Sequence, residues 1–118
     1  MDLETFRNYC IQKDHVEESL PFDEHTLVFK LNNKMFALVS MREERKNACN
    51  LKCDPERAIA LREQFMAVEP GYHMSKKHWN TIAFNEDVND HLIYELIDHS
   101  YDLIFKSFSK KVQKELSK

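Results

Sequence analysis

The chain of 118 residues contains a single glycine, Gly71. Phosphate-binding loops, dinucleotide-binding turns and the Gly-x-Ser-x-Gly turn of a catalytic serine all need several glycines at fixed spacing, so the sequence excludes them. No apolar run approaches the roughly 18 residues of a membrane span, and mean hydropathy is -0.61. The first residues have neither the basic region nor the apolar core of a signal peptide. We therefore expect one soluble, cytoplasmic domain over residues 1–118.

Cysteine is also scarce, with three residues at Cys10, Cys49 and Cys53. An odd number without a secretory signal favours reduced thiols over disulfides. Side chains alternate along a strand, so Cys49 and Cys53 share the core face of a predicted strand, while Asn50 and Lys52 share the other face. Cysteines on a strand cannot form the tight knuckle of a structural zinc site. The sequence therefore predicts buried thiols, and neither a metal nor another cofactor is expected.

Charge is distributed unevenly around a net value of -3. Residues 1–24 sum to -5 and residues 85–105 to -6, whereas residues 25–84 and 106–118 carry +4 each. A nucleic-acid-binding domain is usually basic overall, so a polyanion would have to meet the central segment or the C-terminal tail. The acidic stretches are interpreted as solvated surface.

The element pattern begins with a helix that Asp2 caps. Residues 26–31 and 34–40 form two strands of a hairpin, which turns through Asn32 and Asn33 because asparagine tolerates positive φ. Residues 13–24, which are acidic and contain a proline, are assigned no helix or strand.

The second half of the chain alternates strands and helices. We expect a strand over residues 48–53, then a helix from the Asp54-Pro55 start to about Met66, with Phe65 on its buried side. Pro70-Gly71 is expected to form a type II turn with Gly71 at positive φ. A single helical turn over residues 75–79, a strand over 80–84, a long helix from about residue 89 to 105 and a basic tail complete the chain. This order predicts an α+β fold, with helices packed on one face of an antiparallel sheet.

No arrangement of residues indicates catalysis. His91 and His99 lie eight residues apart on the last helix, so they point in different directions. Serine or cysteine is not visibly paired with histidine and an acid. We expect a protein that is not an enzyme.

Residues 72–80 are the most distinctive segment. They place two lysines, two histidines and the only tryptophan within nine residues after the Pro-Gly pair. Lysines contact phosphates, and aromatic faces stack on bases, so the segment could bind nucleic acid. In the alternative interpretation, Trp79 begins a strand and fills the edge of the core, while the lysines are merely solvated.

The chain resembles the MmcQ/YjbR family over nearly its whole length. The resemblance rests on Asn50-Leu-Lys-Cys-Asp-Pro55 and Pro70-Gly-Tyr-His-Met-Ser-Lys-Lys-His-Trp-Asn-Thr81, with further matches in the first hairpin and in Leu96-Ile-Asp-His-Ser-Tyr-Asp102. It implies a CyaY-like (frataxin-like) sandwich and a DNA-binding function with a "double wing" description. This chain departs from the family pattern at Asp23, where the family usually has glycine.

The resemblance and the central segment together lead to a functional hypothesis. We expect a monomer that binds nucleic acid, DNA in the first instance, weakly and with strong salt dependence. Phosphates would be contacted by Lys52, Lys76 and Lys77; stacking or surface shape would come from Tyr72 and Trp79; hydrogen bonds would come from His73, His78 and Asn80.

Two alternatives remain open. One is a metal-handling or protein-interaction module that uses Glu17, Glu18, Asp23 and Glu24 as oxygen ligands. The other is a small-ligand-binding domain, or an enzyme, with a pocket around His73 and His78.

Overall fold

The computed structural model describes residues 1–45, 47–71 and 74–118. The described residues form the following helices and strands. They are α1 (Leu3–Ile11), β1 (Val16–Ser19), β2 (Thr26–Leu31), β3 (Lys34–Ser40), β4 (Ala48–Lys52), α2 (Pro55–Gln64), β5 (Val68–Pro70), β6 (Trp79–Ala83), α3 (Asp90–Ser107) and α4 (Lys110–Leu116).

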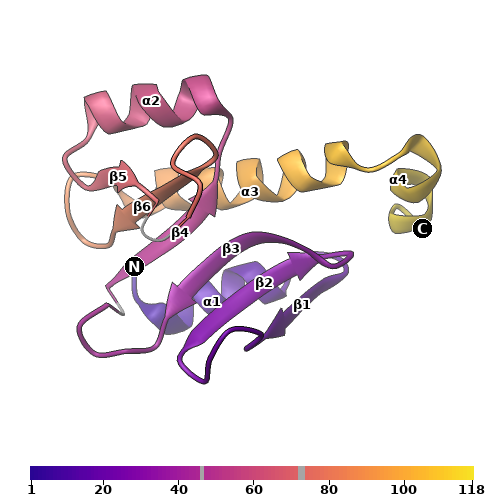
Figure 1. Ribbon diagram of the computed structural model, residues 1–118, viewed down its shortest axis with the longest axis horizontal. Coiled ribbons are helices and arrows are strands. Elements are labelled where there is room, and N and C mark those ends of the chain that lie inside the picture. The colour runs from indigo at the N-terminus through magenta and orange to yellow at the C-terminus, as the bar shows by residue number, and fades with distance from the viewer. Residues whose placement is uncertain (46, 72–73) are drawn as a thin grey trace.

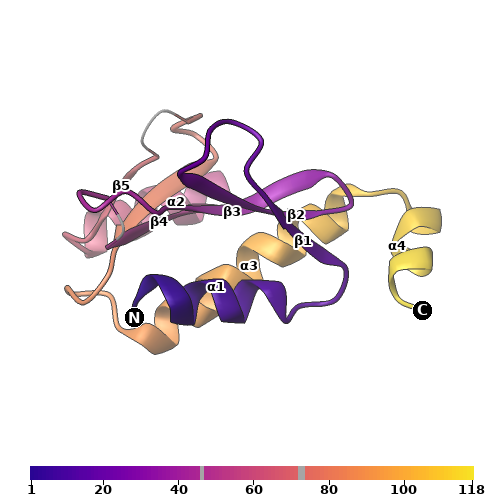
Figure 2. The ribbon, with the colours of Figure 1, turned by 90° about the horizontal axis from the view of Figure 1, so that it is seen from below.

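The strands form one antiparallel sheet in the order β1-β2-β3-β4-β6-β5. α1 and α3 lie together on one side of this sheet, α2 runs along β5, and α4 extends past the end of α3 (Figures 1 and 2). We call the side under α1 and α3 the covered face and the opposite side the open face. The predicted α+β class, with an antiparallel sheet, is confirmed.

The covered face holds the hydrophobic core. Alternate residues of the central strands point into it, and the ring of Phe6 on α1 lies 6.1 Å from Phe29 on β2 and 5.7 Å from Phe84. α3 contributes a buried stripe that includes Ile93 and Ile97. Burial of these side chains is the main source of stability for a fold of this kind.

Local signals set the helix starts as expected. The side chain of Asp2 accepts a hydrogen bond from Thr5 N, Asp54 accepts one from Arg57 N, and Asn89 accepts one from Leu92 N. These bonds satisfy amides that have no partner inside the helix. The Asn32-Asn33 hairpin turn is also confirmed, because both residues have positive φ, 48° and 68°.

Three elements were not predicted. β1 is an acidic edge strand held by pairing with β2 and by a two-pronged ion pair between Arg7 and Glu18, which are long-range contacts that local propensity does not show. β5 is only three residues long, and α4 is a short basic helix that Ser109 caps. The expected burial of Phe65 is partly wrong: α2 ends before it, and its extended backbone leaves the ring half-buried.

The expected type II turn at Pro70-Gly71 is wrong. The φ of Gly71 is not positive, and its N–H donates to the carbonyl of Trp79 at 2.8 Å, which continues the pairing of β5 with β6. Glycine is needed there for a different reason. A Cβ at this position would lie 2.7 Å from Trp79 Cβ, closer than packed carbon atoms approach.

The three cysteines are buried and free, as predicted. Burial raises the pKa of Cys53 to about 11 and raises that of Cys49 well above its usual value, so both thiols stay protonated at neutral pH.

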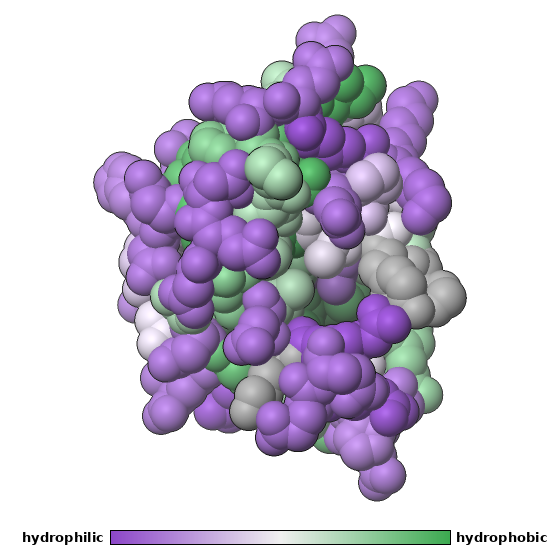
Figure 3. All heavy atoms as spheres, turned by 90° about the vertical axis from the view of Figure 1, so that its left-hand side faces the viewer, coloured by the Kyte–Doolittle hydropathy of each residue, from purple (hydrophilic) through white to green (hydrophobic). Residues whose placement is uncertain are grey.

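Over the described residues, none of the helices is long and apolar enough to cross a membrane. The side of the molecule shown in Figure 3, which is the left-hand side of Figure 1, is covered mostly by hydrophilic side chains with narrower hydrophobic areas between them.

Candidate nucleic-acid interface

The segment singled out by its composition forms a short turn that leads into β6. Trp79 N and His78 N both donate to the carbonyl of Ser75, at 3.0 and 3.2 Å, which confirms the single turn expected there. The carbonyl of His78 accepts from Cys53 N at 2.8 Å, and Lys52 pairs with Trp79 in register. The turn is therefore joined to the end of β4. Tyr72 and His73 lie outside the described residues.

Arg62 on α2 anchors this turn. Its Nε donates to Asn80 Oδ1 at 2.6 Å, and its Nη2 donates to the carbonyls of Trp79, at 3.3 Å, and of Lys76. Three bonds from one planar guanidinium fix the turn against α2. Arg62 is thus a positioning residue for the segment, a role that sequence reasoning did not assign to it.

Asn80 is not available to a ligand. It is 1% exposed, and its amide nitrogen donates to the carbonyl of Ala58 at 3.3 Å while its oxygen accepts from Arg62. The expectation that Asn80 donates to nucleic acid is corrected: in β6 it alternates onto the covered face, where α2 satisfies it.

Trp79 is also enclosed. It is 6% exposed and packs against Gly71, so its ring cannot serve as a stacking surface for a base. The alternative interpretation, in which Trp79 begins a strand and fills the edge of the core, agrees with its burial and with its position as the first residue of β6.

The cationic members of the segment are accessible. Lys76, Lys77 and His78 are exposed, and Lys76 Nζ reaches the carbonyl of Gly71 at 3.3 Å. Lys52 is half-buried at the end of β4 and shares the open face with Asn50, because Cys49 and Leu51 take the covered face. These residues remain candidates for phosphate contacts.

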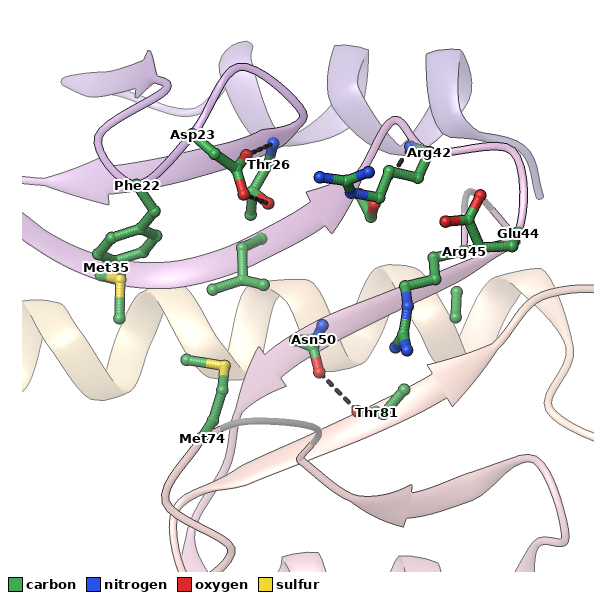
Figure 4. A pocket seen from close by; sticks show the side chains of 13 residues that line it. Phe22, Asp23, Thr26, Met35, Arg42, Glu44, Arg45, Asn50, Met74 and Thr81 are labelled. Atoms are coloured by element: carbon green, nitrogen blue, oxygen red, sulfur yellow. Dashed lines mark hydrogen bonds between the residues drawn. The ribbon is translucent and has the colours of Figure 1, made fainter.

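A pocket of about 770 Å³ lies on the open face. Its floor is the middle of β3, β4 and β6, and it is bordered by Phe22 and Asp23, by residues 42–45 and by Met74 before β6 (Figure 4). Pockets that hold small molecules typically measure about 300–1,000 Å³. The size and the sheet floor make it a candidate binding site.

The two ends of the pocket differ in chemistry. Phe22 and Met35 lie on one side with Met74 facing them (Figure 4), and Leu38 on β3 also lines the pocket. The other end is polar and is lined by Arg42, Glu44, Arg45, Asn50 and Thr81. A ligand that fits must combine an apolar surface with hydrogen-bonding groups.

Asp23 shapes the border of the pocket. Its Oδ1 accepts from His25 N and Thr26 N, both at 2.8 Å, and these backbone bonds, with the charge of Arg42, hold its pKa below the usual value. Asp23 therefore stabilises the turn through its own side chain.

Sequence reasoning missed the pocket. Asn50 was placed on the correct face, but Phe22 lies in one connection and Arg42 and Arg45 lie in another, and only the fold brings the two connections together. One signal in the sequence was Phe22, a large aromatic residue in an acidic, proline-containing loop, where exposure of an apolar side chain to water is unfavourable.

The small-ligand alternative expected its pocket around His73 and His78. His78 is not among the residues that line the pocket found here.

The four acids of the metal-handling alternative do not gather into a site. Glu18 is engaged by Arg7, and Asp23 caps its own turn. Within the described part of the chain, no group of three or more histidine, cysteine or acidic side chains could hold a metal ion.

Comparison with known proteins gives a consistent family match. A family model described as YjbR matches residues 11–103. Protein YjbR of Escherichia coli K12 is 36% identical over 101 residues, which are 86% of this chain and 85% of that protein. Protein YbdF of Escherichia coli O157:H7 is 32% identical over 115 residues, 96% of this chain and 92% of that protein.

Comparison with solved structures agrees with this family match. A crystal structure of a Deinococcus radiodurans protein with a DUF419 domain superposes with a TM-score of 0.91 at 37% identity, covering 98% of this chain and 88% of that one. A crystal structure of a Pseudomonas syringae protein gives a TM-score of 0.75 at 28% identity, covering 87% and 98%. The names of these relatives carry no biochemical activity, so function has to be argued from the site.

Proposed function

The chain belongs to the YjbR family, and we propose that it is a non-enzymatic, monomeric protein that binds nucleic acid through the open face of its sheet. The observation that carries the proposal is that Arg42 and Arg45 line the pocket, while Lys52, at the end of β4 on the open face, pairs in register with Trp79 next to the turn that bears Lys76 and Lys77. The proposal includes DNA as the nucleic acid and a CyaY-like sandwich as the fold, both of which the family resemblance implies.

The proposed contacts follow from exposure. Lys76 and Lys77 on the turn, Lys52 on β4, and Arg42 and Arg45 on the connection supply charge for phosphates. Acidic side chains lie among them, and the whole chain carries -3, so long-range attraction to a polyanion is small. Binding is expected to be weak and to depend strongly on salt.

The test is fluorescence anisotropy of a labelled single strand and a labelled duplex, titrated at several salt concentrations. Replacing Lys76 and Lys77 together by alanine removes two phosphate contacts. Each contact contributes about -0.9 to the slope of log affinity against log salt, so the double variant should flatten the slope by about 2 and weaken binding to all sequences alike.

α4 offers a matched control. Replacing Lys110 and Lys111 by alanine removes the same charge from a helix that lies beyond the end of α3 (Figure 1). That variant should leave the slope nearly unchanged. If it weakens binding as much as the Lys76/Lys77 variant, the basic C-terminal segment carries the interface instead. No binding to either probe at low salt would contradict the proposal altogether.

A further inference from the structure

The apolar end of the pocket exposes side chains that would be more stable when covered. Phe22 is 65% exposed at the tip of its loop, and its ring lies over Met35, with Met74 approaching from the turn before β6 (Figure 4). An aromatic ring and two thioethers form a soft surface that suits a flat ligand, because both groups interact favourably with aromatic faces.

The polar end presents an oriented amide. Thr81 Oγ1 donates to Asn50 Oδ1 at 2.5 Å, which turns the amide nitrogen of Asn50 toward the pocket (Figure 4). In the described part of the chain no hydrogen bond uses that nitrogen. Its two N–H groups can therefore donate to a carbonyl oxygen or ring nitrogen of a ligand. Arg42 and Arg45 line the same end and can meet an anionic group.

From these features we infer that the pocket holds one unstacked nucleotide, and this inference rests on the proposed function. The base would lie against Phe22 and Met74 with an acceptor on its edge bonded to Asn50, and its phosphate would face Arg42. A base inside a duplex has both faces stacked and its edge paired, so it cannot enter a pocket of this kind without leaving the helix. The open face therefore selects single strands, and a free nucleotide offers the same chemistry.

The first experiment separates base from phosphate. A labelled single-stranded DNA is compared with a labelled strand of equal length in which every base is absent and the sugar-phosphate backbone is kept. Stacking of a base on an aromatic side chain supports about a tenfold or greater gain in affinity. The normal strand should bind about tenfold more tightly than the abasic strand, and more tightly than the duplex.

Variants locate the effect. Phe22→Ala should reduce the affinity for the normal strand to that for the abasic strand and leave the abasic strand unaffected. Met66→Ala is the matched control, because Met66 is a large apolar residue, 90% exposed, between α2 and β5. It should change neither affinity. Equal binding of normal and abasic strands, or equal effects of the two variants, overturns the inference and leaves the proposed function standing.

A second arm tests the free nucleotide. Deoxyadenosine monophosphate should shift the NMR signals of the Asn50 side-chain amide, while deoxyribose 5-phosphate should not. If the nucleotide shifts these signals but no polynucleotide binds, the pocket is a nucleotide site and the proposed function fails. If deoxyribose 5-phosphate shifts the Asn50 signals as much as the nucleotide does, the pocket recognises phosphate alone and the inference fails. The inference also fails if neither compound shifts them.

Discussion

The two faces of the sheet are built from the same strands but differ in the burial of their side chains and in the segments that surround them. On β4, Cys49 and Leu51 point to the covered face and are 0% and 2% exposed, whereas Asn50 and Lys52 between and beside them remain half-buried on the open face. The covered face is packed against helices that the hydrophobic periodicity of the sequence predicts. The open face is shaped by three connections that have no periodic pattern.

This difference separates stability from binding. A residue on the covered face acts through packing, and its replacement leaves a cavity. A residue on the open face meets solvent or a ligand, and its replacement costs the fold little. Arg62 links the packed part of the molecule to the proposed binding surface, because it extends from α2 and holds the turn before β6.

The largest expected effect lies in the core. Phe6 is fully buried between Phe29 and Phe84, so Phe6→Ala should lower the free energy of unfolding by about 3–5 kcal/mol. Urea unfolding followed by the fluorescence of Trp79 measures it. The conservative Phe6→Leu should lose less than about 2 kcal/mol because most of the volume is kept. Similar, small losses for both variants would show that this face is loosely packed.

A smaller effect is expected where β5 meets β6. Gly71→Ala puts a Cβ within 2.7 Å of Trp79 Cβ and 3.0 Å of its carbonyl oxygen, so the strands must separate slightly. Overpacking of this kind lowers stability by about 1–3 kcal/mol, and the fluorescence of Trp79 should change in the native state. Ser75→Ala, on the exposed turn nearby, should stay within about 0.5 kcal/mol. Full stability of Gly71→Ala would contradict the close approach.

The sequence predicted the covered face well because packing leaves a periodic record. The spacing of Ile93, Leu96 and Ile97 identifies the buried side of α3, and alternation identifies Cys49 and Cys53 as core thiols. Caps at Asp54 and Asn89 mark helix starts through local hydrogen bonds. Such signals involve residues close together in sequence.

The open face, the start of β6 and β1 could not be predicted in the same way. Trp79 is buried where the start of β6 pairs with Lys52 at the end of β4, and the burial of Asn80 depends on its hydrogen bonds with Arg62 and Ala58, which are 18 and 22 residues away. Composition indicated that the segment is unusual, but it did not show which side chains are enclosed. β1 escaped prediction for the same reason, because its support comes from Arg7 and β2 rather than from its own residues.

A pH effect distinguishes the covered side further. His99 Nε2 on α3 accepts a hydrogen bond from Asp54 N at the start of α2, at 3.1 Å. Burial, with the nearby charge of Arg57, lowers the pKa of His99 below its ordinary 6.5. As the pH falls, His99 therefore binds a proton in the unfolded chain before it does so in the native protein. The contribution of His99 to the free energy of unfolding is fully present above about pH 6.5, and it is lost as the pH drops from there through the lower native pKa.

The control for this effect is His99→Gln, which can still accept from Asp54 N but does not titrate. Urea midpoints measured at several pH values should fall less steeply below about pH 6.5 for this variant than for the parent chain. Equal slopes for the two proteins would show that His99 does not contribute to the acid sensitivity.

The smallest effect on folding belongs to the residue with the largest proposed role in binding. Phe22 is 65% exposed on a loop whose turn is held by Asp23 through backbone amides, so its ring supports neither the core nor the turn. Phe22→Ala should change the free energy of unfolding by less than about 0.5 kcal/mol, measured in the same urea experiment as Phe6→Ala. Two phenylalanines in one small chain would then differ about tenfold in their cost to the fold, because one is enclosed and the other lies at a site that only a ligand could cover. A loss above about 1 kcal/mol would place Phe22 in the packing of the protein itself, and the apolar end of the pocket would then be a structural contact rather than a surface open to a base.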